Sequence, residues 1–174
     1  MKALILAAEG FEDLELFGLW HRLREARVEV TLAGPTGHKL TGAHGYPLEP
    51  DMPIREINPN EYELLVIPGG ASSERLRLRE EAVDVARTFM EDDRRVVVVG
   101  RGIQLLISAG ALNGRQATCA PAIRDDIRAA GATYRDESVV VDGNLFSCRG
   151  VDELPDFYRK LMASLFAAPV PVTA

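Results

Sequence analysis

The chain has 174 residues, of which 47% are hydrophobic and 26% charged, and its formal net charge is −6. A chain of this length can bury about two thirds of the surface that its unfolded form exposes, so it needs no disulfide or metal to complete a core. The acidic balance disfavours a nucleic-acid surface, because phosphate binding requires clustered lysine and arginine side chains.

The first eight residues are interpreted as a buried strand and not as a targeting segment. They are apolar, but three acidic residues follow between positions 9 and 13, before a signal peptide would be complete. No apolar run approaches the roughly 20 residues needed to cross a bilayer. The two cysteines, Cys119 and Cys148, form neither a disulfide framework nor a zinc site. We therefore expect a cytoplasmic protein with no metal and no cofactor, and with neither nucleic acid nor a membrane as partner.

The first hundred residues alternate between two kinds of apolar pattern. Continuous apolar runs of strand length lie at Ala3–Ala8, Val28–Ala33, Leu64–Ile67 and Val96–Val99. Helical spacing joins Leu16, Leu19, Trp20 and Leu23 in one segment, and Ala82, Val85, Ala86 and Phe89 in another. Strands alternating with helices predict a three-layer α/β/α sandwich with a mostly parallel sheet.

One segment, residues 36–59, breaks this alternation. Glycines and prolines interrupt every pattern in it, so we expect a hairpin flap there and no separate domain.

The remaining elements follow from turn and cap residues. We expect a helix over Gly102–Ala109 ended by Gly110, a short strand over Gln116–Cys119, a helix over Pro121–Gly131, a hairpin over Val139–Ser147 that turns at Gly143, and a last helix over Glu153–Phe166. Residues 1–166 are expected to form a single domain, and residues 167–174 a flexible tail.

The most informative segment is the junction between the fourth strand and the helix after it. The strand Val96–Val99 runs directly into Gly100-Arg101-Gly102. A strand, a tight turn and a helix in this order lift one residue above the carboxyl edge of the sheet, which is how nucleophile elbows and anion sites are built. That edge is also the usual ligand site of open α/β sheets.

Several motifs in the same order make the chain resemble a known family. They are Glu9-Gly10-Phe11-Glu12-Asp13, His44-Gly45-Tyr46, Leu65-Val66-Ile67-Pro68-Gly69-Gly70, Glu74-Arg75, Gly102–Gly110, Pro121, Asp125-Asp126, Val141-Asp142-Gly143-Asn144 and Ser147. From Met1 to about Phe166 the chain is similar to the PfpI-type intracellular proteases and deglycases of the DJ-1/PfpI superfamily. The resemblance implies the flavodoxin-like, class I glutamine-amidotransferase-like fold.

The same resemblance shows what this chain lacks. The family elbow reads Cys-His-Gly, with a thiolate nucleophile and a neighbouring histidine, whereas this chain has Gly100 and Arg101. Glycine has no nucleophile, and a guanidinium is not a general base. Ala120 stands where the family usually has Tyr or His. The family also brings an acidic residue, matching Glu74, to the elbow from a neighbouring subunit, which implies a homodimer or a hexamer.

Other family features are retained. Glu12 matches the carboxyl group beside the cysteine, and the amides of Gly70 and Arg101 match the oxyanion hole. Gly100 suits the strained elbow position, because glycine adopts such backbone angles without penalty. The resemblance thus implies a pocket that could hold a small anion or another small molecule.

Each of these residues also has a purely structural interpretation. Arg101 could form an ion pair with Glu12 or with Glu74 of a partner subunit, or it could bind a ligand carboxylate or phosphate. Cys119 could be a displaced nucleophile, but a lone buried thiol is more often part of the core, and the same holds for Cys148. His44 could be catalytic or could shape a turn or an interface. Glu12 and Asp13 could simply be first-turn acids that favour the helix dipole.

Three hypotheses follow. The first is a catalytically degenerate family member that binds, senses or scaffolds. The second is an active hydrolase, glyoxalase or deglycase of the stress-response type that uses Cys119 or a water activated by Glu12. The third is a structural partner that assembles with an active paralogue.

Overall fold

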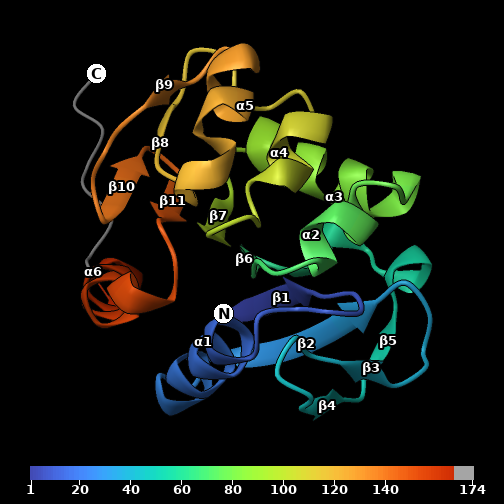
Figure 1. The fold of residues 1–174 in the computed structure, drawn as a ribbon. Helices are drawn as coiled ribbons and strands as arrows, with labels where there is room; N and C mark the ends of the chain where they lie inside the picture. Colours follow the sequence, from blue (N-terminus) through green and yellow to red (C-terminus); the bar gives the residue numbers. More distant parts are fainter. Residues whose placement is uncertain (167–174) are drawn as a thin grey trace.

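The structure, a computed structural model, describes residues 1–166 and is built on a seven-stranded sheet (Figure 1). The strand order is β10-β11-β7-β6-β1-β2-β5. The strands are β1 (Lys2–Leu6), β2 (Glu29–Gly34), β5 (Met52–Pro53), β6 (Leu64–Ile67), β7 (Arg95–Val99), β10 (Val139–Asp142) and β11 (Leu145–Cys148). Neighbouring strands pair in parallel except β10 and β11, which form an antiparallel hairpin. The predicted mostly parallel sheet is confirmed.

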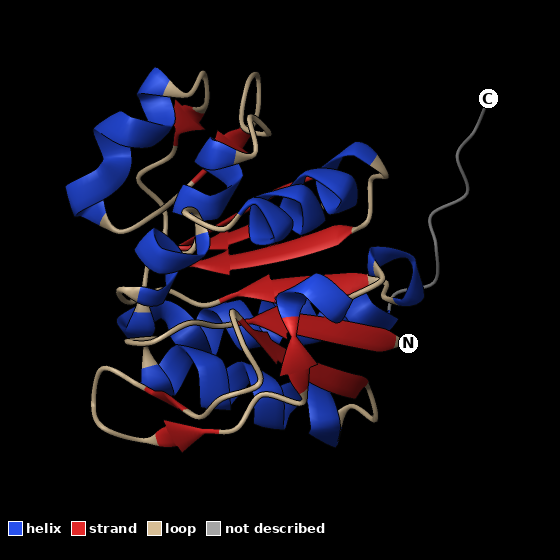
Figure 2. Ribbon diagram, turned by 90° about the vertical axis from the view of Figure 1, so that its right-hand side faces the viewer, coloured by secondary structure: helices blue, strands red, loops and turns tan. Residues whose placement is uncertain are grey.

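Helices cover both faces of this sheet, which confirms the predicted three layers (Figure 2). The helices are α1 (Asp13–Glu25), α2 (Ser72–Leu76), α3 (Glu80–Glu91), α4 (Gln104–Ser108), α5 (Arg124–Ala129) and α6 (Leu154–Phe166). Helices α1 and α6 pack on one face and α2 to α5 on the other. Within residues 1–166, no helix combines the length and the apolar character that a membrane span requires.

Strand β1 shows why its sequence is apolar throughout. Ala3 and Ile5 belong to the core under α1 and α6, whereas Leu4 and Leu6 belong to the core under α2 to α5. Successive side chains of a strand point to opposite faces, so a strand covered on both faces needs an apolar residue at every position. β1 is therefore an interior strand, paired with β6 and β2 and covered by helices on both faces.

The order of the strands determines where a ligand site can form. From β1 the chain goes first to β2 on one side and then to β6 on the other. Loops that leave β1 and β6 in opposite directions open a crevice at the carboxyl edge of the sheet. The loop that leaves β7, on the far side of β6, lies at this same edge.

The predicted flap is confirmed as a small hairpin. Strand β3 (Leu40–Thr41) pairs antiparallel with β4 (Pro47–Leu48). The sequence pattern did not predict that the same segment also supplies β5, which joins the edge of the main sheet beside β2. Pro53 is tolerated in β5 because an edge strand has backbone groups that need no partner.

Asp13 fastens the flap to the first turn of α1. Its carboxylate, only 3% exposed, accepts the His44 N–H at 2.8 Å and the Tyr46 N–H at 3.1 Å. Gly42 packs so closely that a Cβ there would lie 2.2 Å from the carboxylate. The interpretation of Asp13 as only a first-turn acid was therefore wrong, because its charge is used to satisfy backbone amides of the flap.

The remaining elements are close to those predicted, with a few differences. The predicted helix over Gly102–Ala109 begins as α4 only at Gln104, because Gly100–Ile103 form a tight turn. The predicted helix from Pro121 begins with a 3-10 turn before α5, and the predicted strand near Gln116 pairs in a separate two-stranded sheet. Helix α2 was not predicted, since five residues are too few to show a period.

The short elements complete the description: β8 (Gln116–Ala117), β9 (Thr133–Tyr134) and the 3-10 helices η1 (Ile54–Glu56), η2 (Pro59–Glu61), η3 (Pro121–Ile123) and η4 (Val151–Glu153). The expected tail, residues 167–174, lies outside the described residues. The assignment of residues 1–166 to a single domain stays a prediction.

Candidate functional site

The turn after β7 has the geometry expected of an elbow. Gly100 has a φ of +55°, in the left-handed region that glycine adopts most easily. Its N–H donates to the carbonyl of Cys148 at 2.9 Å, and the Gly102 N–H donates to the carbonyl of Val99 at 2.8 Å. A Cβ on Gly102 would lie 2.1 Å from the carbonyl oxygen of Ile67, so position 102 admits no side chain. The elbow is thus fixed by backbone contacts to β6 and β11.

The carboxyl group beside this elbow belongs to Glu15. One of its oxygens, Oε2, accepts the Gly69 N–H at 2.6 Å, and the other, Oε1, lies 3.2 Å from the position that a Cβ on Gly100 would occupy. The residue is 4% exposed. A side chain at position 100 would therefore point at a buried carboxyl group.

Burial changes the acidity of this group. Loss of water raises the pKa of Glu15 to about 7; the hydrogen bond from Gly69 opposes this rise, and the negative charge of Glu12 adds to it. Near neutral pH the protonated and ionised forms are then both populated. Glu15 has the acidity of a group that can give or take a proton at physiological pH.

This geometry corrects the assignment of Glu12. Its side chain caps α1 by accepting the Glu15 N–H at 2.8 Å, and its Oε1 lies 3.1 Å from Nε2 of His44. The elbow carboxyl is Glu15, three residues further along the helix. The signal in the sequence was the position of Glu15, directly beside Leu16 in the apolar face of α1. A glutamate at such a position is buried, and a buried glutamate usually has a specific partner.

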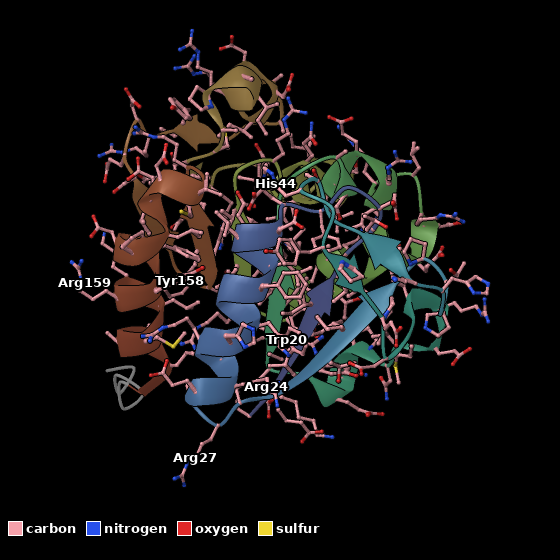
Figure 3. The ribbon with its side chains drawn as sticks, turned by 60° about the horizontal axis from the view of Figure 1, so that its bottom comes forward. Trp20, Arg24, Arg27, His44, Tyr158 and Arg159 are labelled. Atoms are coloured by element: carbon pink, nitrogen blue, oxygen red, sulfur yellow. The ribbon has the colours of Figure 1, made fainter. Side chains whose placement is uncertain are left out.

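His44 belongs to the flap and not to the elbow. Its side chain is 64% exposed. It lies near the end of α1 that Glu12 caps, as Figure 3 shows. This placement agrees with the alternative in which His44 shapes a turn.

Arg101 is engaged in an ion pair within the chain. Its Nη1 lies 2.9 Å from Oε1 of Glu74, and both side chains are about half exposed. The alternatives for this arginine placed Glu74 on a partner subunit or used Glu12, whereas the structure forms the pair with Glu74 of the same chain. An exposed pair of this kind contributes about 0 to 1 kcal/mol, so a competing ligand could displace it.

The two amides expected to form an oxyanion hole come from adjacent loops. A Cβ on Gly69 would lie 3.1 Å from the Arg101 nitrogen, so the turn after β6 touches the elbow. Gly70 has a φ of +76°. Within residues 1–166, neither the Gly70 N–H nor the Arg101 N–H donates to a protein acceptor.

The remaining predicted site residues divide between the elbow and the core. Ala120 lies at the elbow, because its N–H donates to the carbonyl of Gly100 at 3.3 Å. Cys119 is fully buried, and burial raises the pKa of its thiol to about 12, with the charge of Asp126 adding to the rise. Cys148 is also fully buried, and burial raises the pKa of its thiol to about 12. Neither thiol ionises near neutral pH, so neither can supply a thiolate.

Residues 1–166 contain no group of three or more His, Cys, Asp or Glu side chains placed to hold a metal ion. The structure thus brings together Glu15, Gly69, Gly100, Arg101 and Ala120. It leaves Glu12 at the helix cap and Cys119 in the core.

Comparison with known proteins gives a consistent result. The sequence model of the DJ-1/PfpI family matches residues 1–164. The deglycase TK1284 of Thermococcus kodakarensis is 44% identical over 165 residues, which cover 95% of this chain and 99% of that protein. The deglycase PfpI of Pyrococcus furiosus is 43% identical over 165 residues, with the same shares covered.

Solved structures share the fold. A two-domain protein of Anabaena variabilis, with DJ-1/ThiJ/PfpI-like and ferritin-like domains, superposes with a TM-score of 0.93 at 32% identity. The comparison covers 100% of this chain and 52% of that longer one. A DJ-1 superfamily protein of Salmonella typhimurium superposes with a TM-score of 0.88 at 24% identity, covering 98% of this chain and 93% of that one.

The substitution Glu15→Gln is expected to reduce the pH dependence of stability between about pH 4.5 and 7. The folded state keeps the Glu15 proton up to about pH 7, whereas the unfolded chain loses it near the ordinary pKa of 4.5. The free energy of unfolding therefore falls as the pH rises through this window, by about 3 kcal/mol for this group. Urea denaturation across the window measures the difference between variant and wild type.

The matched control is Glu91→Gln, which changes an exposed glutamate at the end of α3. Its stability should follow the wild-type curve. An identical pH dependence in Glu15→Gln and the wild type would show that folding does not raise the pKa of Glu15.

Proposed function

This chain belongs to the DJ-1/PfpI family, and we propose that within the family it is a catalytically degenerate member that acts by binding a ligand. The observation that carries the proposal is the elbow itself. The buried carboxyl of Glu15 faces position 100, where the family resemblance expects a cysteine, and this chain offers only the backbone of a glycine. Covalent catalysis requires a nucleophile beside its proton acceptor.

The two cysteines of the chain do not replace the missing nucleophile. Both are fully buried with thiol pKa values near 12, so the thiolate is a negligible fraction at neutral pH. Cys119 also belongs to the core between the sheet and α4 and α5. These facts favour the degenerate family member over an enzyme that uses Cys119.

The ligand that we propose is a small anion. The amides of Gly70 and Arg101 have no protein acceptor within residues 1–166, and Arg101 can add a full positive charge if it leaves Glu74. Charge-assisted hydrogen bonds contribute about 1.5 to 3 kcal/mol each, so two or three of them give millimolar to micromolar affinity. Binding, sensing or scaffolding would then depend on displacement of the Arg101–Glu74 pair.

A second function is favoured by one observation, the pKa of Glu15 near 7. In this alternative a water molecule takes the place of the missing side chain beside Gly100, and the Glu15 carboxylate removes a proton from it as its oxygen attacks the imine carbon of the substrate. Glu15 returns that proton to the nitrogen, and the carbon–nitrogen bond then breaks to release the free amine and the carbonyl compound. The relatives named deglycases suggest the substrate class, a glycated amine. This alternative replaces Glu12 with Glu15 as the activating group.

We also propose that the chain forms a homodimer or a hexamer in the cytoplasm. The supporting feature is an apolar groove of about 470 Å³ along α1 and the flap, lined by Asp13, Leu14, Phe17, Trp20, His21, Tyr46 and Pro47. Leu14 is 64% exposed and Tyr46 62%. Trp20 is partly buried against the core, and its ring lies 5.9 Å from that of Phe17. Exposed apolar patches of this kind commonly mark interfaces.

Helix α1 is suited to pairing with its own copy. Leu14, Phe17 and His21 line the groove from one face of this helix. A two-fold axis perpendicular to α1 would place two copies of this face side by side and antiparallel, with opposed helix dipoles. A second copy would therefore cover the apolar groove.

The wild type is expected to show no turnover that iodoacetamide abolishes, with a 2-oxoaldehyde, a glycated peptide or an unmodified peptide as substrate. The double substitution Gly100→Cys and Arg101→His should create such turnover, because it places a thiol against Glu15. A cysteine at the φ of Gly100 costs about 1 to 3 kcal/mol of strain, which the fold can sustain. Steady-state assays with and without iodoacetamide measure turnover by the wild type and by the double variant.

Two outcomes of these assays would contradict the proposal. Wild-type turnover that disappears in Cys119→Ser would show that the buried thiol is the nucleophile. Wild-type turnover that resists iodoacetamide but disappears in Glu15→Gln would establish the activated-water alternative instead.

The anion proposal predicts a selective rise in melting temperature. At constant ionic strength, phosphate, sulfate or citrate should stabilise the wild type more than chloride does, because an oxyanion can accept several amide hydrogen bonds. Glu74→Gln should strengthen the effect by releasing Arg101, and Arg101→Ala should abolish the selectivity. Thermal-shift titration measures all three, with Arg124→Ala as the exposed-arginine control.

If no oxyanion stabilises either the wild type or Glu74→Gln, this anion site does not exist. The Arg101–Glu74 pair would then be purely structural.

The assembly proposal predicts a homo-oligomer at micromolar concentration. Leu14→Asp should raise the dissociation constant at least tenfold, because a carboxylate in an apolar interface must be desolvated. Leu78→Asp, which changes a leucine that is 83% exposed elsewhere, should leave the assembly unchanged. Sedimentation velocity measures each protein. A monomeric wild type, or dissociation by Leu78→Asp alone, would reject the α1 interface.

A further inference from the structure

A second groove lies at the carboxyl ends of β1 and β2, apart from the elbow. Its volume is about 380 Å³, and it is lined by Ala8, Glu9, Pro35, Leu40, Arg75, Leu78 and Arg79. Ala8 and Glu9 follow β1, and Pro35 follows β2. The connection between α2 and α3 forms the opposite wall. This edge of the sheet is where open α/β folds bind ligands.

The floor of the groove is apolar and held in place. Ala8 and Leu40 are buried, with exposed fractions of 1% and 7%. The Ala8 N–H donates to Oγ of Ser72 at 2.8 Å, which ties the end of β1 to α2. The Thr41 N–H donates to Oε2 of Glu9 at 2.9 Å, which ties the flap to the same loop. A ligand would therefore meet a preformed surface.

Two arginines on the wall of the groove, Arg75 and Arg79, have no partner within residues 1–166. Within residues 1–166, neither Arg75 nor Arg79 forms a salt bridge, and neither side chain donates a hydrogen bond. Their neighbours are engaged: Arg77 donates to Oγ of Ser108 at 2.8 Å, and Glu74 pairs with Arg101.

The charges that line the groove favour an anion. Two arginines and one glutamate line it, which leaves one net positive charge. Glu9 is the carboxylate that opposes an anion, and one of its oxygens already accepts the Thr41 N–H. The protein as a whole carries −6, so a positive groove is a local exception.

Leu78 provides an exposed apolar side chain on the same wall of the groove. It stands between the two free arginines in sequence and is 83% exposed, the largest exposed fraction among the large apolar side chains of residues 1–166. A ligand with an apolar body would cover Leu78 and remove it from water. Charge and apolar surface thus occur together in one groove.

We propose that this groove binds a carboxylate carried on an apolar chain. The carboxylate lies between Arg75 and Arg79, because a guanidinium offers paired donors that match a carboxylate. The chain lies on Leu40, Pro35 and Leu78. The volume is within the range of small-molecule sites. This site is separate from the elbow, since neither Gly100 nor Arg101 lines it.

Octanoate tests the proposal, with binding to the whole protein measured by isothermal titration calorimetry. The wild type should bind octanoate at millimolar concentration or below. The double substitution Arg75→Gln and Arg79→Gln should weaken binding at least tenfold, because it removes two charge-assisted contacts. Leu78→Ser should weaken it several-fold through the lost apolar contact. All three side chains are exposed, so folding should be unaffected, which thermal unfolding verifies.

The controls separate the charged and apolar parts of the ligand. Arg124→Gln, which changes an exposed arginine on α5, should bind octanoate like the wild type. Acetate, which lacks the chain, and octan-1-ol, which lacks the charge, should each bind at least tenfold more weakly than octanoate. Equal affinity of the wild type and the double variant, equal affinity for octan-1-ol, or no octanoate binding at millimolar concentration would each overturn the proposal.

Discussion

The hydrogen bond between the buried Glu15 carboxyl and the Gly69 N–H joins the parts of the candidate site. It connects α1 to the loop after β6, and the other oxygen of the same carboxyl lies against the turn after β7. Three segments from different parts of the chain therefore meet at one side chain. Because burial favours the protonated form of Glu15, this carboxyl is only partly ionised near neutral pH.

The elbow keeps its shape without a reactive side chain because backbone contacts form it. Gly102 lies directly against the Ile67 carbonyl, and the Gly100 N–H is bonded to the Cys148 carbonyl. Neither contact involves the side chain at position 100. The shape of this elbow therefore does not depend on a reactive side chain, which is the physical basis for the proposed binding role.

The acidic side chains at the start of α1 have different roles. Glu12 caps the helix and contacts His44, Asp13 binds the flap amides, and Glu15 supports the elbow. All three are acidic and lie within four positions of the chain. The Glu12 side chain is 16% exposed and caps the helix, whereas Glu15 is 4% exposed and supports the elbow. Different burial therefore accompanies different roles for these two glutamates.

Local chemistry was enough to predict the layers, the four buried strands, the flap hairpin, the Gly143 turn and the elbow at Gly100, because apolar periods and turn residues act over a few neighbouring positions. The tertiary structure was needed to show that Glu15 and not Glu12 lies beside Gly100, and that Arg101 pairs with Glu74 of its own chain. Glu12 and Glu15 are about one helical turn apart, so the packing of α1 against the sheet decides which of them is buried. Arg101 and Glu74 are 27 positions apart, and only the arrangement of β6, α2 and β7 brings their charges together.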